Sequence, residues 1–307
     1  MQQHLQRSRI SDRVARLVFF FCAILLIAVI LSVIVFIGSK ALLIFFEGVN
    51  APTFFTNTKW DPTGSSGTVS FGAGGLILGS VVTTALAVII VTPLAIGTAV
   101  FFTELAPKSV VTFLQPLIEI FTGMPSVVIG FLGLIVLVPF LQKASSPITG
   151  GLVTGGYGWG AATLVLVAMI LPTVISVSID ALRAVPGSVR EASFALGSTR
   201  WQMMSRAVIP AAAAGLGTAV VLGMARAIGE TLAVAIVLGG KSLPTNLLTL
   251  AVFFQPNVNM TMLIAQDFGE TAGTAQNAYW TLAFVLLTIS FLFICISRYL
   301  ANRSVYK

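Results

Sequence analysis

Long apolar stretches separated by short polar segments dominate the hydropathy pattern of this chain. A transmembrane helix needs about 20 predominantly apolar residues, and six stretches approach or exceed that length. They lie at residues 17–46, 76–102, 110–141, 160–179, 211–238 and 279–296. The pattern therefore predicts an all-α integral membrane protein whose transmembrane domain covers residues 17–301.

The first apolar stretch follows an arginine-rich segment at residues 1–16. A secretory signal has an apolar region of only about 7–15 residues and a small-residue cleavage site. The longer run at 17–46 is therefore expected to be a transmembrane helix that starts inside the cell.

The third apolar stretch is interrupted by Gln115, Pro116 and Glu119, and then by the sequence GMPS that begins at Gly123. One interpretation is a helix broken at membrane depth, which is tolerated where the backbone faces protein or a water-filled cavity. The other is a helix that is only kinked.

Basic residues indicate which side of the membrane each polar segment faces, because cytoplasmic loops carry an excess of Lys and Arg. With residues 47–75, 142–159 and 239–278 outside, most basic residues lie inside and three lysines are clear exceptions. Both termini, including the tail at 302–307, are then cytoplasmic. Residues 247–254 are apolar but too few to cross, so we expect an interfacial or re-entrant piece.

Composition supports a membrane protein and excludes several other classes. The 307 residues are 57% hydrophobic and only 9% charged, and the formal net charge is +7, whereas a soluble domain has about one quarter charged residues. The positive residues flank apolar stretches, so topology explains them better than a nucleic-acid partner does. Cys22 and Cys295 lie singly in apolar runs, so no metal site or disulfide framework is expected.

A basic segment at residues 180–210 interrupts the apolar pattern on the predicted inner side. Good helix formers lead to Gly197, which can supply a left-handed turn, and Ser198 or Thr199 can cap a second helix that runs to Ile209. We expect a helix, a turn and a helix at the membrane face.

Two charged residues, Arg226 and Glu230, fall inside the fifth apolar stretch. Arg226 lies about 23 Å from the start of this stretch at ~1.5 Å per residue, close to the membrane midplane. The i,i+4 spacing allows an ion pair that is only structural. The alternative is that the guanidinium lies in a transport pathway, held by Glu230 until an anion competes, and intramembrane charges favour this functional interpretation.

Glu119 is a further intramembrane carboxylate, which either pairs with Arg226 or faces inner water. The sequence GGKS at Gly239 resembles the end of a phosphate-binding loop, but Ala235 stands where the first glycine of that motif is required. No ATP site is expected in this chain.

The spacing of Glu191, Ala192, Gly197 and Pro210 resembles the EAA loop of ABC-importer permeases. The family pattern has Glu-Ala-Ala, a glycine after three residues, and Ile-x-Leu-Pro after nine more. Departures here are Ser193, Ala207 and Ile209, all conservative in size or polarity. The resemblance implies that this loop, with Arg200, is a coupling helix that seats in a separate ATP-hydrolysing subunit.

The sequences PSVVIGFLGL, ALRAVPGSVREASFALGSTRWQ, ARAIGETLAV and FFTNTKWDP resemble the phosphate-specific ABC importer permeases of the PstC type over nearly the whole chain. The resemblance implies a six-helix, MetI-like bundle of type I in a bacterial plasma membrane. It also implies a second permease, an ATP-binding subunit dimer that holds ATP and Mg²⁺, an extracytoplasmic phosphate-binding protein, and phosphate as substrate. By position, Arg226 and Glu230 match the charged pair of the family's translocation path.

The leading functional prediction is therefore a non-enzymatic permease subunit for inorganic phosphate that works by alternating access. A related importer for another oxyanion is one alternative, and an ion-coupled secondary anion transporter is another. An intramembrane enzyme is disfavoured, because no nucleophile or metal constellation is evident.

Overall fold

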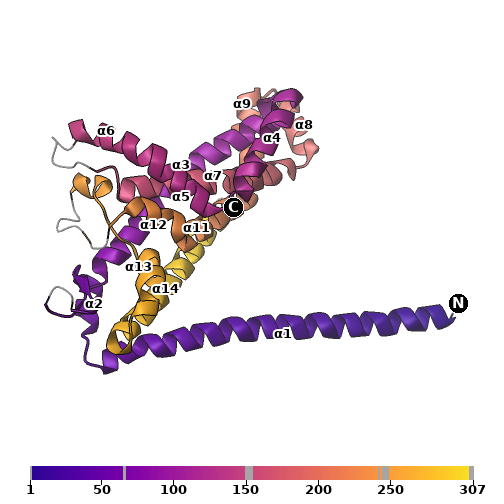
Figure 1. The fold of residues 1–307 in the computed structure, drawn as a ribbon. Helices are drawn as coiled ribbons and strands as arrows, with labels where there is room; N and C mark the ends of the chain where they lie inside the picture. The colour runs from indigo at the N-terminus through magenta and orange to yellow at the C-terminus, as the bar shows by residue number, and fades with distance from the viewer. Residues whose placement is uncertain (1, 65–66, 149–154, 241–242, 244–248, 304–307) are drawn as a thin grey trace.

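The computed structural model describes residues 2–64, 67–148, 155–240, 243 and 249–303, and most of them are helical (Figure 1). Within these ranges, the sheet structure is one short hairpin of β1 (Trp60–Asp61) and β2 (Ser70–Phe71), which pair antiparallel. Five described helices are long and apolar enough to cross a membrane, or six if one bent pair is a single span. The prediction of an all-α membrane protein is confirmed.

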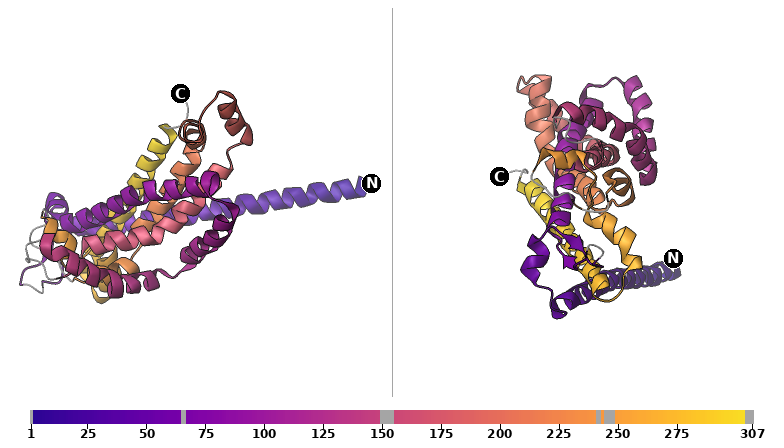
Figure 2. Two further views of the ribbon diagram at one scale, coloured as in Figure 1. Left: turned by 90° about the horizontal axis from the view of Figure 1, so that it is seen from above. Right: turned by 60° about the vertical axis from the view of Figure 1, so that its left-hand side comes forward.

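Helix α1 (Gln2–Phe46) is continuous and extends away from the other helices over most of its length (Figures 1 and 2). Its last turns pack on α14 (Gly273–Arg303). There the Thr281 hydroxyl donates to the carbonyl of Ala41 at 2.8 Å, and the rings of Phe36 and Trp280 meet edge to face. Helix α1 is thus attached to its own chain at one end.

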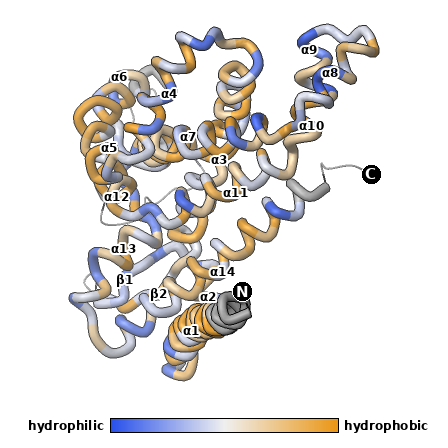
Figure 3. The backbone as a smooth tube through the Cα atoms, turned by 90° about the vertical axis from the view of Figure 1, so that its right-hand side faces the viewer, coloured by the Kyte–Doolittle hydropathy of each residue, from blue (hydrophilic) through white to orange (hydrophobic). Residues whose placement is uncertain are grey.

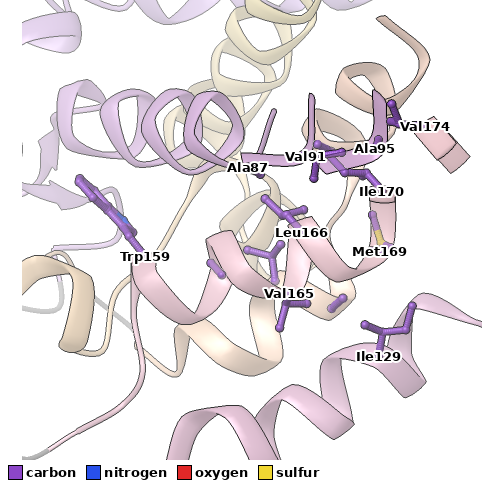
Figure 4. Close-up of a cluster of buried hydrophobic side chains, with 14 of the residues drawn as sticks. Ala87, Val91, Ala95, Ile129, Trp159, Val165, Leu166, Met169, Ile170 and Val174 are labelled. Atoms are coloured by element: carbon purple, nitrogen blue, oxygen red, sulfur yellow. The ribbon is translucent and has the colours of Figure 1, made fainter. Parts of the chain in front are cut away.

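The centre of the bundle is formed by α3 (Gly74–Val100) and α7 (Trp159–Arg183), which pack side by side. Small buried residues of α3, including Ala87 and Ala95, lie opposite Leu166, Met169 and Ile170 of α7 (Figure 4). Small residues allow membrane helices to approach closely and to gain van der Waals contact. These two helices form the frame on which the candidate site is built.

The third apolar stretch is broken rather than kinked. Helix α4 (Lys108–Gly123) ends before Met124 and Pro125, whose backbones are extended, and α5 (Ser126–Leu132) follows. The chain continues through a π-helical segment, η2 (Gly133–Leu137), into α6 (Val138–Ile148). Proline restricts the residue before it to extended conformations, which explains the position of the break.

The fifth apolar stretch is also broken, and the expectation of one helix at 211–238 is wrong. Helix α11 (Ala213–Gly229) ends where Glu230 turns extended, with ψ 125°, and α12 (Leu232–Leu238) begins after Thr231. The last residue of α11 is Gly229, and glycine is the least helix-prone residue after proline. The Glu230 carboxylate that follows accepts a hydrogen bond from the Ala233 N–H at 3.1 Å. The break therefore supplies its own cap for α12.

The remaining described elements lie at the two ends of the bundle. Figure 3 shows hydrophilic residues at α8 and α9 at one end and around β1, β2 and α13 at the other. The second end holds α2 (Ala51–Thr56), η4 (Leu250–Phe254), α13 (Met260–Asp267) and η5 (Phe268–Glu270). Residues 250–254 of the expected interfacial piece form a single short 3₁₀ helix, whereas 247–248 lie outside the described residues, as does the tail from 304.

Candidate functional site

The break between α11 and α12 places Arg226 and Glu230 in different surroundings. Arg226, half-buried in the last turn of α11, donates from Nη1 to the Thr173 hydroxyl of α7 at 2.8 Å. Glu230 instead caps α12. No ion pair joins the two residues, both of which are described, so the expected i,i+4 pair is wrong. The reason is that the helix stops between them, and the spacing that would align their side chains is lost.

A narrow cavity lies beside Glu230 and is lined by polar side chains of α3 and α13. Its water-accessible volume is about 10 Å³, which is room for about one water molecule. The polar lining residues are Ser80, Thr83, Thr84, Glu230, Asn259 and Thr261. The Thr261 hydroxyl donates to the Glu230 carbonyl at 3.2 Å, so one backbone group freed by the break is satisfied from α13.

Sequence reasoning missed the hydroxyl residues of α3. Ser80, Thr83 and Thr84 stand three and four positions apart, which places them on one face of a helix. That spacing was the available signal, but isolated hydroxyls in membrane helices commonly bond to their own backbone, as Thr83 does to the Gly79 carbonyl at 2.8 Å.

Glu119 does not approach Arg226. It is exposed on α4, where its Oε1 accepts a hydrogen bond from Gln115 Nε2 at 3.1 Å. Gln115 in turn accepts from Arg183 Nη2 of α7 at 3.4 Å. Of the two alternatives left by the sequence, the pairing with Arg226 is therefore wrong, and Glu119 belongs to a polar strip between α4 and α7.

The segment from residue 187 to 211 folds as the expected helix, turn and helix. Helix α8 (Gly187–Ala195) leads to Gly197, whose φ of +78° is left-handed, and Thr199 caps α9 (Arg200–Met203) in a capping box with Gln202. The second helix continues as the π-helical η3 (Met204–Val208) and α10 (Ile209–Ala211). We refer to residues 187–211 as the coupling segment.

The tip of the coupling segment exposes large apolar side chains at the polar end of the molecule. Phe194, Leu196 and Trp201 are 45%, 89% and 71% exposed, and Glu191, Ala192 and Arg200 beside them are exposed too. Pro210 is partly buried at the far end. Clustered exposed apolar side chains are typical of sites that contact another protein or a membrane. These three apolar residues were not among the predicted site residues.

Comparison with known proteins gives the family. The family described as "Binding-protein-dependent transport system inner membrane component" matches residues 93–306. This chain belongs to that family. The permease is 41% identical over 302 residues to a probable ABC transporter permease, YqgH, of Bacillus subtilis, covering 97% of this chain and 93% of that protein. It is 34% identical to the phosphate transport system permease PstC of Mesorhizobium japonicum, covering 90% of this chain and 88% of that protein.

Solved structures show that the fold of the permease is that of MetI-like ABC importer subunits. A chain of a bacterial transporter that imports the polysaccharide alginate superposes with a TM-score of 0.59 at 14% identity, covering 91% of this chain and 95% of that chain. A chain of the methionine transporter MetNI superposes with a TM-score of 0.55 at 16% identity, covering 75% of this chain and 95% of that chain. The predicted MetI-like fold is confirmed, and the permease is a subunit of an ABC importer.

Proposed function

We propose that this permease carries inorganic phosphate across the membrane by alternating access. The observation that carries the proposal is the environment of Arg226: a half-buried guanidinium in an apolar helix whose hydrogen bond goes to the neutral hydroxyl of Thr173. Within the described residues no carboxylate neutralises it. A guanidinium fork matches the oxygens of a tetrahedral oxyanion, and the similarity to PstC supports phosphate as that oxyanion.

The same proposal assigns roles to the two intramembrane carboxylates. Glu230 lies at the break, so a change in the angle between α11 and α12 moves it relative to Arg226 and alters the charge in the pathway. Glu119 would contribute to the polar strip on the inner side of α4. Broken helices at membrane depth are a recurring device of transport proteins, because they place polar backbone beside a pathway.

The coupling segment would seat in the ATP-binding subunit through Glu191, Ala192, Gly197 and Arg200, with Pro210 ending the loop. In this assignment it is cytoplasmic, both termini are cytoplasmic, and the β1–β2 hairpin faces outward. The partners are a second permease, an ATP-binding dimer that holds ATP and Mg²⁺, an extracytoplasmic phosphate-binding protein, and the lipid of a bacterial plasma membrane. This chain itself would hold no cofactor and contact no nucleic acid.

The direct test is uptake by the assembled complex in lipid vesicles. Labelled phosphate should accumulate only when the vesicles contain hydrolysable ATP and the binding protein is present outside. Uptake driven by an ion gradient without ATP would identify a secondary transporter instead. Faster uptake of another oxyanion, such as sulfate or molybdate with its own binding protein, would move the substrate away from phosphate.

A substitution in the turn of the coupling segment should reduce transport without preventing insertion. Gly197→Val places a β-branched residue at φ +78°, and although a Cβ there would meet no atom within 4 Å, the left-handed backbone itself is strained. Such strain costs about 1–3 kcal/mol, so the turn should shift and ATP-driven uptake should fall.

The measurement for Gly197→Val is phosphate uptake per assembled complex, with membrane abundance determined separately. Gly187→Val is the matched control, because Gly187 also has open space around its Cβ position but lacks a positive φ. Wild-type uptake in the Gly197 variant would contradict a coupling role for this turn.

A further inference from the structure

The coupling segment is fastened to the membrane helices by one extensively bonded arginine, Arg190 of α8. Its Nη2 lies 2.7 Å from Oε1 of Glu104, and its Nε lies 3.2 and 3.3 Å from the two carboxylate oxygens. Glu104 belongs to η1 (Phe101–Leu105), the π-helical continuation of α3. The side chains of Glu104 and Arg190 are only 8% and 24% exposed.

The other N–H groups of Arg190 bind the end of a second membrane helix. Nη1 donates to the Val185 carbonyl at 2.8 Å, and Nη2 donates to the Leu182 carbonyl at 3.1 Å. Leu182 is in the last turn of α7, where carbonyl groups lack helical partners and carry partial negative charge. One guanidinium thus joins α8 to the ends of both α3 and α7.

Helices α3 and α7 lead from this joint to the candidate site. Helix α3 carries Ser80 and Thr84, which line the cavity beside Glu230, and α7 carries Thr173, which holds Arg226. The two helices also pack closely on each other. A displacement of α8 that leaves the joint intact must therefore move the ends of both helices that frame the site.

We propose that the Glu104–Arg190 ion pair is the joint through which the coupling segment moves α3 and α7. This inference rests on the proposed function, since it assumes that ATP hydrolysis elsewhere displaces the coupling segment. Glu104 and Arg190 are positioning residues in this scheme: they touch neither phosphate nor ATP. A guanidinium fork with two bonds to a carboxylate fixes orientation as well as distance, and a lysine cannot replace that geometry.

The test measures phosphate transported per ATP hydrolysed in vesicles that contain the assembled complex. Glu104→Gln keeps the shape of the side chain but removes the charge and one acceptor. We expect ATP hydrolysis to persist while the phosphate-to-ATP ratio falls about tenfold, within the range reported for disrupted coupling networks. Arg190→Lys should give an intermediate ratio, because it keeps the charge and loses the fork.

The control is Arg298→Gln, which removes a positive charge from an exposed position near the described end of α14. The amount of phosphate transported per ATP hydrolysed should be the same in this variant as in the wild type. A purely structural ion pair would lower the number of assembled complexes and leave the ratio of the survivors unchanged. A wild-type ratio in assembled Glu104→Gln, or in Arg190→Lys if the first variant fails to assemble, would overturn the proposal.

A second measurement separates failure of the joint from failure of the proposed function. Spin labels at the exposed positions Leu105 and Ala195 report the distance between η1 and α8 without any transport. The distribution of distances between the two labels should stay narrow on ATP binding when Glu104 is intact. In Glu104→Gln this distribution should broaden. An equally narrow distribution in both proteins would refute the joint, whereas absence of ATP-dependent phosphate uptake by the wild type would refute only the assigned substrate and mechanism.

Discussion

Arg226→Gln should abolish phosphate uptake, with a fall of about 100-fold or more per assembled complex, since removing one partner from a desolvated charge interaction typically costs ~2–5 kcal/mol. The variant removes the guanidinium on α11, which has no carboxylate partner among the described residues. Arg226→Lys should retain part of the uptake, because it keeps the charge but loses the planar fork.

Thr173→Val distinguishes the charge of Arg226 from its orientation. This control removes the hydroxyl that Arg226 binds at 2.8 Å and keeps the guanidinium. Uptake should fall about tenfold, the lower end of the ~1.5–3 kcal/mol that one hydrogen bond to a charged group contributes. Uptake at the wild-type rate in Arg226→Gln, normalised to assembled complex, would exclude Arg226 from the pathway.

The double variant Arg226→Gln with Glu230→Gln should remain as inactive as Arg226→Gln alone. The two side chains are not paired, so removal of the Glu230 charge gives no compensation at Arg226. Recovery of transport in the double variant would instead show that the two charges neutralise each other during the cycle and act as a packing pair.

Gly130→Val should prevent the permease from assembling. Gly130 of α5 is buried against α12, and a Cβ at this position would lie 2.6 Å from the Cα and 3.0 Å from the carbonyl oxygen of Ala233. Overpacking in a well-packed core costs about 1–3 kcal/mol, and here the obstacle is backbone that cannot rotate away. The helices at the break would have to separate.

The measurement for Gly130→Val is the amount of complex that remains monodisperse after extraction from the membrane. Gly123→Val is the matched control, because Gly123 ends the preceding helix and a Cβ there would meet no atom within 4 Å. Equal recovery of the two variants would show that α5 and α12 do not need this close approach.

The sequence predicted those features that depend on local chemistry. Pro125 marked where the third apolar stretch is interrupted, because proline acts on its own neighbour, but a break and a kink both stayed open. Gly197 and Thr199 marked the turn of the coupling segment because one tolerates a left-handed backbone and the other caps a helix. Apolar length alone was enough for the membrane class.

The features that the sequence did not predict depend on residues far apart in the chain. The break at Glu230 has no proline, and its carbonyl is bound by Thr261 of α13. The Glu104–Arg190 pair joins residues 86 positions apart. The cavity beside Glu230 likewise needs α3 and α13 to meet. The i,i+4 pattern and the local hydropathy report on a single helix. Contacts between helices determine where a helix breaks and which side chains meet, so neither pattern could predict these features.

The attachment of α1 to α14 has a consequence for biogenesis. The Ala41 carbonyl and the Thr281 hydroxyl that join these helices are 240 positions apart, so α1 leaves the ribosome well before α14 and must await it. During that interval the face of α1 that packs on α14 lacks that partner and must be stable in lipid. The high mean hydropathy of Val14–Phe46 suits that state, and closure of the bundle is therefore a late step of synthesis.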